Sequence, residues 1–394
     1  MMEIKTRDKI PHEWLLLLAM AFMCFNLRTA ITAIDPLLKM IEKDVGISME
    51  WSGAFALLPV AALGISSMIT PKLSDYLSIW KVILIFQLLA CVGVCWRSMD
   101  GIVGLYGGVL LLGLGAGVVG SCMPGFIKLH FPVRAPLYMG AYSACLGVGV
   151  TLASATSAPI AQHWGGWRMG LGFWGLPMLI GVALWGGYFL ISKGFAKRTT
   201  LPTHITKMLK KRIAWNVTIF YTSRIASAYF FYTWITVLLQ NKGLSSDDAG
   251  FVMAVTSLAG IPSSLFSNWF SAKLGGDGRL IIISAIVSIL SCWLIFYLPI
   301  FCILPMAILL GLGSGAIFAR GMGFMVLRAK DEVSAIELSG MAQGCGFILG
   351  AGIAFCCSSL IHPTGGFIIF CLLYTVFNLI SMIYGTICSK PGEV

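Results

Sequence analysis

Three arginines, Arg28, Arg224 and Arg320, lie inside stretches of this sequence that are otherwise apolar. A charged side chain near the centre of a bilayer costs at least about 3 kcal/mol on insertion scales, so it is retained mainly where it faces protein or a water-filled path. Arg28 and Arg224 each occupy the first apolar stretch of one half of the chain. Because a planar guanidinium can hold an oxyanion through two parallel hydrogen bonds, this pair predicts an anion clamp.

Polar and aromatic side chains accompany the two arginines at helical spacing. Tyr221 and Ser227 fall on the Arg224 face of a helix, and Gln343 lies at a similar depth in a later apolar stretch. The substrate contacts predicted besides the two arginines are Asn26, Thr29, Thr32, Tyr142, Tyr221, Tyr229, Trp234 and Gln343. Helix packing is the alternative role for each aromatic residue, because aromatic rings bury a large apolar area wherever they lie.

Four charged residues are candidates for gating or coupling, namely Asp35, Asp75, Arg320 and Glu337. Asp35 follows Arg28 by seven residues, which places it two turns outward on the same face of a continuous helix. Glu337 is expected to reach Arg320 or Arg328 from the start of a later helix. Because a fixed cation keeps a neighbouring acid ionised, we expect gating or orienting ion pairs, with proton transfer as the alternative.

The composition excludes a soluble protein. Hydrophobic residues make up 58% of the chain and charged residues 11%, whereas an average soluble domain has roughly 25% charged residues. A helix of about 20 apolar residues crosses the hydrocarbon core of a bilayer, so a chain of this length allows about a dozen crossings. The 45 glycines suit helices in lipid, where small residues let backbones approach closely.

Apolar runs between polar residues predict twelve membrane-spanning helices that must position these side chains. The predicted spans are 14–38, 51–71, 79–97, 102–127, 137–162, 169–192, 214–240, 248–272, 279–299, 301–327, 333–361 and 366–388. The first span continues past Arg28 and Asp35 without a small-residue cleavage site, so we do not expect it to be a cleaved signal peptide.

The distribution of basic residues predicts the orientation. Of the 27 lysines and arginines, 19 fall on the side that holds both termini, and five fall on the other side, including Arg97 and Arg168. By the positive-inside rule both termini are predicted to be cytoplasmic. The net charge of +11 therefore reflects topology, and no nucleic-acid partner is expected.

No constellation typical of an enzyme, a metal site or a cofactor site is present in the sequence. All 12 cysteines fall within the apolar spans, without the spacing of metal ligands. The five histidines form no His-Glu-x-x-His motif, and no phosphate-binding Gly-x-x-x-x-Gly-Lys loop occurs. We therefore predict no enzymatic activity, no cofactor and no bound metal.

An internal repeat predicts two similar halves. The stretch Gly113 to Gly117 matches Gly311 to Gly315 at an offset of 198 residues, and Phe126 matches Phe324 at the same offset. The predicted units are an N-terminal six-helix half at 1–192, a basic cytoplasmic linker at 193–213 and a C-terminal six-helix half at 214–394. Parallel repeats of this kind place the substrate near the midplane, at the interface between the halves.

Several short motifs, spread over nearly the whole chain, together resemble one known family. They are Asn26-Leu27-Arg28-Thr29-Ala30-Ile31, Phe131-Pro132 to Arg134, Met139-Gly140-Ala141-Tyr142-Ser143, Gly166-Trp167-Arg168, Leu171-Gly172-Phe173-Trp174-Gly175-Leu176-Pro177 and Leu338-Ser339-Gly340-Met341-Ala342-Gln343. In these motifs the chain resembles the cyanate permease and 2-nitroimidazole transporter branch of the major facilitator superfamily. The resemblance implies an all-α membrane protein with the major facilitator fold, that is, twelve transmembrane helices in two six-helix pseudo-repeats.

The sequence departs from this family at two places. The family usually has a proline two positions after the tryptophan of span seven, whereas Trp234 is followed here by Ile235 and Thr236. The basic loop after span two is reduced to Asp75 and Lys81. The first departure concerns substrate identity, and the second concerns the usual cytoplasmic gate contact.

The expected function is secondary active transport of a small organic or inorganic anion by alternating access. One alternative is an exporter of flat neutral compounds such as nitroaromatics, and another is a membrane sensor that binds its ligand without moving it. The expected partners are the small-molecule substrate and the lipid bilayer, with a coupling proton as a further candidate. We expect a monomer in the inner membrane of a bacterium.

Overall fold

The computed structural model describes residues 10–46, 49–99, 101–192, 208–361 and 366–394, and within these ranges every regular element is a helix. Side chains are described from residue 57 onward in the third helix. Most of the predicted linker at 193–213 lies outside the described residues.

Helices of the first half account for the first six predicted spans. They are α1 (Glu13–Thr32), the short 3-10 helix η1 (Asp35–Leu37), α2 (Leu38–Val45), α3 (Met49–Tyr76), α4 (Ile79–Met99), α5 (Ile102–His130), α6 (Ala135–Trp164), α7 (Gly166–Gly172) and α8 (Gly175–Ile191).

Helices of the second half account for the other six. They are α10 (Arg212–Asn241), α11 (Ser246–Leu265), α12 (Ser267–Leu274), α13 (Asp277–Tyr297), the 3-10 helix η2 (Ile300–Cys302), α14 (Ile303–Leu327), α15 (Glu332–Ser358) and α16 (Phe367–Ser389).

The predicted all-α membrane architecture is confirmed. In the described part of the chain, 11 segments are helical, long and apolar enough to cross a membrane. The remaining expected span corresponds to α10, which has 30 residues and carries Arg224 among many hydroxyl and aromatic side chains. Polar side chains over such a length indicate a helix that faces protein or a cavity along much of its surface.

Three of the predicted spans are interrupted, which sequence periodicity did not reveal. The first helix ends at Thr32, and Pro36 then lies in the first turn of η1. Proline lacks a backbone N–H and clashes with the preceding turn, so the predicted continuous helix over 14–38 is wrong. The sixth span divides into α7 and α8 between Gly172 and Gly175, and the eighth divides into α11 and α12 at Phe266.

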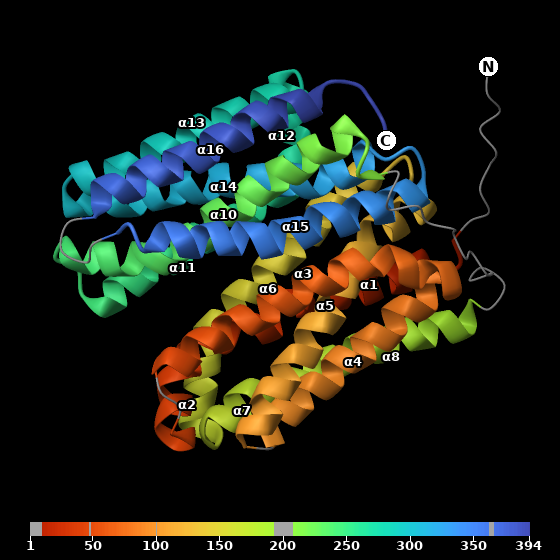
Figure 1. The fold of residues 1–394 in the computed structure, drawn as a ribbon, viewed down its shortest axis with the longest axis horizontal. Coiled ribbons are helices and arrows are strands. Elements are labelled where there is room, and N and C mark those ends of the chain that lie inside the picture. The colour runs from red at the N-terminus through yellow and green to blue at the C-terminus, as the bar shows by residue number, and fades with distance from the viewer. Residues whose placement is uncertain (1–9, 47–48, 100, 193–207, 362–365) are drawn as a thin grey trace.

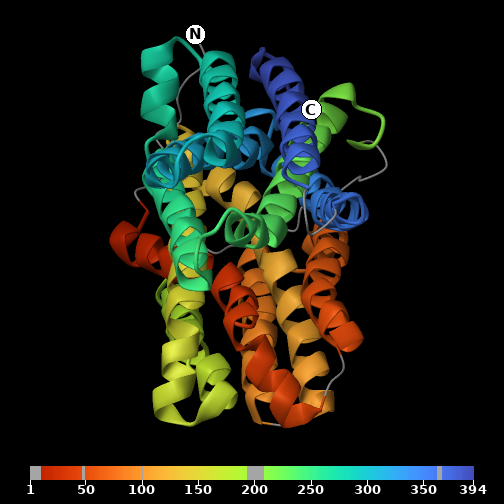
Figure 2. The same cartoon turned by 90° about the vertical axis from the view of Figure 1, so that its left-hand side faces the viewer.

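Helix packing repeats itself between the halves. In the first half α5 packs on α3 and α4, while α1 packs on α6 and α8. The same relations recur in the second half, where α14 packs on α11 and α13, while α10 packs on α15 and α16. Figure 2 shows the two halves as separate groups of helices, red to yellow-green below and green to blue above. The pattern is that of two pseudo-repeats.

The repeated glycines explain why these helices pack so closely. A Cβ atom at Gly113 would lie 2.6 Å from the carbonyl oxygen of Pro59 on α3, and one at Gly311 would overlap the carbonyl of Thr256 on α11. Each glycine therefore lets α5 or α14 approach a neighbour at backbone contact, as small residues do in membranes. The glycine-rich runs of α5 and α14 are therefore packing surfaces.

The two halves converge at the end of the molecule where α1 begins and α16 ends, here called the terminal end (Figure 1). There Lys128 of α5 donates to the carbonyls of Val326 (3.0 Å) and Ala329 (2.5 Å) in the second half. Asn268 of α12 donates to the carbonyl of Pro136 on α6. A cation at the carboxyl end of α14 also complements the helix dipole. These contacts close the terminal end, and the ribbons diverge toward the opposite end (Figure 1).

Candidate functional site

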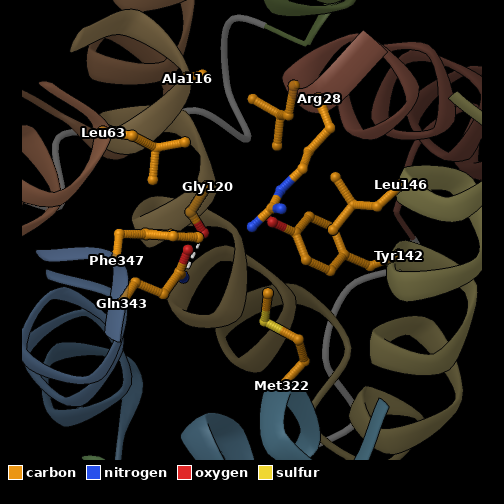
Figure 3. A pocket seen from close by; sticks show the side chains of 10 residues that line it. Arg28, Leu63, Ala116, Gly120, Tyr142, Leu146, Met322, Gln343 and Phe347 are labelled. Atoms are coloured by element: carbon orange, nitrogen blue, oxygen red, sulfur yellow. Dashed lines mark hydrogen bonds between the residues drawn. The ribbon is translucent and has the colours of Figure 1, made fainter. Parts of the chain in front are cut away.

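A small cavity lies between the halves: the space that the centre of a water molecule can occupy is about 10 Å³, within about 260 Å³ of empty space that includes open solvent. Its lining comes from α1, α3, α5 and α6 of the first half and from α14 and α15 of the second. The lining residues are Leu27, Arg28, Leu63, Ala116, Gly120, Tyr142, Leu146, Met322, Gln343 and Phe347. Figure 3 shows the Arg28 guanidinium extending into this space toward the Tyr142 hydroxyl. A cavity shared by two packed halves is a common location for a small-molecule site.

Arg28 is half-buried on α1, and its head group lies against the second half of the molecule. The guanidinium carbon is 4.9 Å from the centre of the Phe347 ring on α15, within the range of a cation–π contact. Tyr229 of α10 also interacts with the guanidinium. However, the Nη2 atom of Arg28 is buried without a hydrogen-bond partner, and no ion pair within the described residues involves Arg28. This arginine therefore has donors that are available for a ligand.

Tyr142 and Gln343 meet at a glycine on the cavity wall. Gln343 is 2% exposed and donates from Nε2 to the carbonyl of Gly120 (3.1 Å) and to Ser339 (2.7 Å). A Cβ atom at Gly120 would come within 3.5 Å of the Tyr142 hydroxyl and 3.3 Å of Gln343 Oε1. Gly120 thus lets two polar groups from different halves approach the same point near Arg28 (Figure 3). Both predicted residues line the cavity, and their contact with substrate stays a prediction.

Tyr221 lies behind the cavity wall. Its ring packs edge-on against Phe347 with centroids 6.1 Å apart, and Gly346 makes room for it. The side chain is fully buried, and its hydroxyl has no hydrogen-bond partner. Tyr221 and Tyr229 therefore place two phenol groups near Arg28 from the α10 side, although neither belongs to the cavity lining.

Arg224 occupies a different environment from Arg28. It is 7% exposed, is not among the residues that line the cavity, and interacts electrostatically with Tyr374 of α16. Its Nε and Nη1 atoms are buried without hydrogen-bond partners. Such a cation is costly to bury, because unsatisfied charged donors lose their hydration. The predicted clamp thus has one arginine in the cavity and a second, unsatisfied one inside the second half.

Several other predicted contacts are directed toward neighbouring helices in this structure. Asn26 donates to the carbonyls of Phe22 (2.6 Å) and Pro177 (2.9 Å), so it ties α1 to α8. Thr29 is fully buried and bonds the carbonyl of Phe25 one turn earlier. In this conformation the α1 face that carries Asn26 and Thr29 packs on α6 and α8, and their contact with substrate stays a prediction.

Thr32 and Trp234 also engage groups of the protein. Thr32 donates to the carbonyl of Arg28 at 3.1 Å, in the last turn of α1. Trp234 donates from its indole nitrogen to Ser358 of α15 at 2.9 Å. Neither residue is among those that line the cavity.

The acids proposed for coupling lie in separate places. Asp35 is exposed and begins η1, beyond the end of α1, so the expected continuation of the Arg28 helical face is wrong. Tyr229 interacts electrostatically with both Asp35 and Arg28, so both charges lie near one phenol. Asp75 is partly buried near the end of α3, and Glu337 is buried in α15 near its start. Their roles in gating or coupling stay predictions.

Arg320 is held by a cluster of partners at the terminal end. Its Nη1 lies 2.7 Å from Asp277 Oδ1, and its Nη2 donates to Ser267 (3.1 Å) and to Asn268. Ser271 also donates to Asp277. Since Asn268 in turn donates to the first half through Pro136, described above, the cluster joins the charge on α14 to the closure between the halves. A role for Arg320 in gating fits this position, with Asp277 as the observed ion-pair partner.

Sequence reasoning missed two residues that the structure makes prominent. Phe347 lies one turn after Gln343 on the same helix face, so the four-residue spacing could have identified it. The sequence indicates only that Arg97 is one of the five basic residues on the side opposite the termini, and it predicts no role for this residue. Arg97 is fully buried in the last turn of α4 and donates to the carbonyls of Ala30 (2.6 Å) and Leu171 (3.4 Å). No pattern in the local sequence distinguishes such an arginine from one at the membrane surface.

Two six-helix pseudo-repeats, a cavity between them and a closed terminal end define a membrane transporter fold. In the described part of the chain, no group of histidine, cysteine and acidic residues could hold a metal ion. The profile of the Major Facilitator Superfamily matches residues 15–351. The chain belongs to this superfamily, whose members are transporters rather than enzymes.

Relatives and a solved structure agree with this assignment. The chain is 26% identical to the 2-nitroimidazole transporter of Escherichia coli (strain K12) over 94% of each chain. It is 25% identical to the cyanate transport protein CynX of the same organism over 89% of this chain and 91% of the relative. An uncharacterized transporter of Bacillus subtilis, YycB, is 26% identical over 87% and 85%. The crystal structure of the transporter FucP in the outward conformation superposes with a TM-score of 0.73 at 11% identity, covering 95% of this chain and 99% of FucP.

Proposed function

We propose that this protein moves a small anion across the bacterial inner membrane by alternating access between its two halves. The observation that carries the proposal is the Arg28 guanidinium, which projects into the cavity between the halves with a buried Nη2 atom that no protein group satisfies. An unsatisfied buried donor on a cation is costly, so its retention is explained best by a ligand that supplies the missing acceptor.

The chemistry of the cavity favours a compact anion with a flat or apolar part. Arg28 supplies the positive charge, and the Phe347 ring covers one side of it. Tyr142 and Gln343 supply neutral polar groups near the same point. Arg28 can donate two parallel hydrogen bonds to an oxyanion or one to a linear anion. Cyanate, the solute named for one relative, has this character.

A second candidate is the export of flat neutral compounds. The rings of Phe347, Tyr142 and Tyr221 surround the cavity or support its wall, and a flat heteroaromatic ring could stack between them. The relative that carries 2-nitroimidazole is as similar to this chain as the others. In that case Arg28 would hold a nitro group or only shape the cavity.

The proposed mechanism begins from the conformation of this structure, closed at the terminal end by Lys128 and Asn268, with Gln343 bonded across the interface at the cavity wall. Substrate enters from the opposite end and draws Arg28 toward itself. The halves, 1–192 and 214–394, then rock about the cavity, while the linker at 193–213 joins them in the cytoplasm. Opening of the path from the cavity through the terminal end requires the release of these three donors, all of which have neutral carbonyl acceptors across the interface.

Asp35 is proposed to interact with Arg28 when the cavity is empty. Both charges lie near Tyr229. The turn at Pro36 would let the Asp35 side chain move toward Arg28. Substrate binding would displace the acid, which follows from differential contacts in the two states. If Asp35 instead carries a coupling proton, Asp35→Asn will retain counterflow of substrate in proteoliposomes and lose proton-driven accumulation. If it is a counter-ion, Asp35→Asn will change substrate affinity and leave the pH dependence of transport intact.

The test of the proposed function is binding and transport by purified protein with matched variants. Cyanate, nitrate, acetate and 2-nitroimidazole are offered to the wild type, to Arg28→Gln and to Arg168→Gln. Arg168 is an exposed arginine whose acid partner, Asp44, is equally exposed, so it controls for loss of a positive charge. The proposal expects an anion to raise the melting temperature and to be taken up by wild-type proteoliposomes, with both effects lost only in Arg28→Gln. Binding of 2-nitroimidazole alone, unaffected by Arg28→Gln, would establish the neutral exporter instead.

The proposed orientation has a test of its own. Arg134 is exposed in the connection before α6, at the terminal end, and Ser245 is exposed before α11, at the opposite end. Single cysteines at these positions, in a background without the exposed Cys95 and Cys356, should react with a membrane-impermeant thiol reagent from opposite sides of the membrane. Labelling of position 134 from the periplasm would reverse the proposed cytoplasmic location of the termini.

A further inference from the structure

The break that ends α1 leaves a backbone carbonyl without its usual partner. In an uninterrupted helix the amide of Ile34 would bond the carbonyl of Ala30. Here that amide bonds the carbonyl of Ile31 instead, at 3.4 Å. The freed Ala30 carbonyl lies two residues beyond Arg28 and five residues before Asp35, so it belongs to the segment that orients the proposed anion-binding cation.

Arg97 of α4 donates hydrogen bonds to this carbonyl and to a second carbonyl from α7, which belongs to another interrupted span. Its Nη1 donates to Ala30 at 2.6 Å, and its Nη2 donates to Leu171 at 3.4 Å. Leu171 lies in the last turn of α7, where carbonyls lack partners within the helix. One guanidinium thus bridges the carboxyl-terminal ends of α1 and α7.

Burial of the Arg97 guanidinium is costly unless nearby negative charge or partial charge compensates for its lost hydration. Arg97 is fully buried, and no acid forms an ion pair with it within the described residues. The carboxyl ends of two helices carry partial negative charge, which favours a cation placed between them. Interrupted transmembrane helices of transporters use such ends and unwound carbonyls to coordinate cations. Here the cation belongs to the protein itself.

Close packing fixes the stem of this arginine. A Cβ atom at Gly108 of α5 would lie 2.6 Å from the Arg97 Cβ atom and from its backbone nitrogen. The glycine therefore lets α5 pack directly against the base of the Arg97 side chain, and only the guanidinium end is left to choose its partners. The fork of two nitrogen donors suits two carbonyls on different helices better than a single ammonium group does.

We infer that Arg97 is a positioning residue: by holding the carbonyl ends of α1 and α7 together, it sets the direction in which Arg28 projects into the cavity. The part of this inference that concerns substrate rests on the proposed function. Anchoring of the helix break does not, because it concerns only contacts within the first half.

The anchoring is tested by chemical rescue. Arg97→Ala leaves a space lined by two carbonyl oxygens, which fits a free guanidinium ion. We expect millimolar guanidinium chloride to raise the melting temperature of purified Arg97→Ala, because a ligand that binds the folded state stabilises it. The wild type and Arg168→Ala, which removes an exposed arginine, should show no increase, and sodium chloride at equal ionic strength should have no effect on any variant. Absence of a guanidinium response specific to Arg97→Ala would overturn the inference.

Positioning is separated from general stabilisation by substrate affinity. In Arg97→Ala the affinity for the transported anion should fall about ten- to a hundredfold, the scale set by a misaligned charge-assisted hydrogen bond. Guanidinium should restore the affinity along with the stability. Recovery of stability without recovery of affinity would show that Arg97 is only structural and would overturn the positioning role. If Arg97→Ala does not fold, Arg97→Lys serves as a second variant, because it keeps the positive charge. It should bind the anion with intermediate affinity and show no guanidinium response, and wild-type affinity in this variant would contradict the inference.

Discussion

Arg28 and Arg320 are both arginines in apolar helices, yet their surroundings differ in kind. Arg320 has an acid at 2.7 Å and two further side-chain acceptors, all supplied by α12 and α13 next to it. Arg28 has an aromatic ring and a phenol from the opposite half, and one buried nitrogen without any acceptor. Arg320 also keeps one buried nitrogen, Nε, without a partner, so the difference lies in its acid and in the acceptors of both its terminal nitrogens. A cation held in this way contributes to a stable closure, whereas a terminal nitrogen without an acceptor is available to bind a ligand.

The difference teaches how to assign roles to charges within a membrane. Burial alone does not distinguish a ligand-binding arginine from a locking one, because both are costly to place in lipid. The terminal nitrogens do distinguish them, because both Nη atoms of Arg320 have acceptors, whereas Arg28 has a buried Nη atom without one. By this criterion Arg97 belongs with Arg320, although its acceptors are carbonyls, and Arg224 belongs with Arg28.

The largest expected effect is the loss of the Arg320 acid. Asp277→Asn leaves a buried guanidinium without its charge partner, which typically destabilises by about 3–5 kcal/mol. Asp44→Asn removes an exposed pair with Arg168 and should cost at most about 1 kcal/mol. Denaturation of both variants in detergent measures the difference. Equal stability of the two would mean that the Arg320 cluster does not lock the terminal end.

The next effect concerns the second unsatisfied arginine. If Arg224 completes the clamp when the halves close, Arg224→Gln should weaken anion binding by about 2 kcal/mol or more, the cost of losing one partner of a buried charged contact. Its folding should not suffer, because two of its nitrogens have no partner to lose. Calorimetric titration with the anion measures the change. An unaltered affinity would show that Arg28 is the only arginine that binds the anion. Arg224 would then be neither a ligand-binding nor a locking arginine.

A smaller change is expected at the aromatic ring beside Arg28. Phe347→Leu keeps apolar volume and removes the cation–π contact, worth about 0.5–2 kcal/mol depending on desolvation. The affinity for the anion should therefore fall by a few-fold to about tenfold. Phe355→Leu changes an exposed phenylalanine on the same helix and serves as the control. A decrease of the same size in both variants would attribute the effect to α15 in general.

The smallest effect is expected at Thr29. Its hydroxyl bonds a carbonyl of its own helix, so Thr29→Val should leave anion affinity unchanged and cost about 0.6 kcal/mol of stability, the average for a hydrogen bond within a membrane protein. The same titration and denaturation measure both quantities. A clear loss of affinity would return Thr29 to the substrate contacts predicted from the sequence.

The architecture could be predicted because lipid imposes a simple rule. Long apolar runs must be helical there, so hydropathy alone located every expected span, and the glycine repeat indicated two similar halves. The helix breaks could not be predicted from hydropathy, because Pro36 and the Gly172–Gly175 segment end a helix without ending the apolar run. Periodicity arithmetic across such a break fails, which is why the expected alignment of Asp35 with Arg28 is wrong.

The site could be predicted only in part. Arginine in an apolar run is a strong signal, and Arg28, Tyr142 and Gln343 do line the cavity. Asn26 and Thr29 share a helix with Arg28 but face other helices, and the sequence does not reveal which face of α1 packs. Whether a charge is satisfied depends on residues far away in the chain, as Arg97 with Leu171 shows.

The central claim is that Arg28 is kept incompletely satisfied in order to bind an anion. It is tested most directly by measuring anion affinity and thermal stability together in Arg28→Gln. We expect anion binding to be lost while the melting temperature stays equal to that of the wild type or rises, because the substitution removes a charge with a buried, unsatisfied donor at a functional site. Retained anion affinity in a stably folded Arg28→Gln protein would contradict the account.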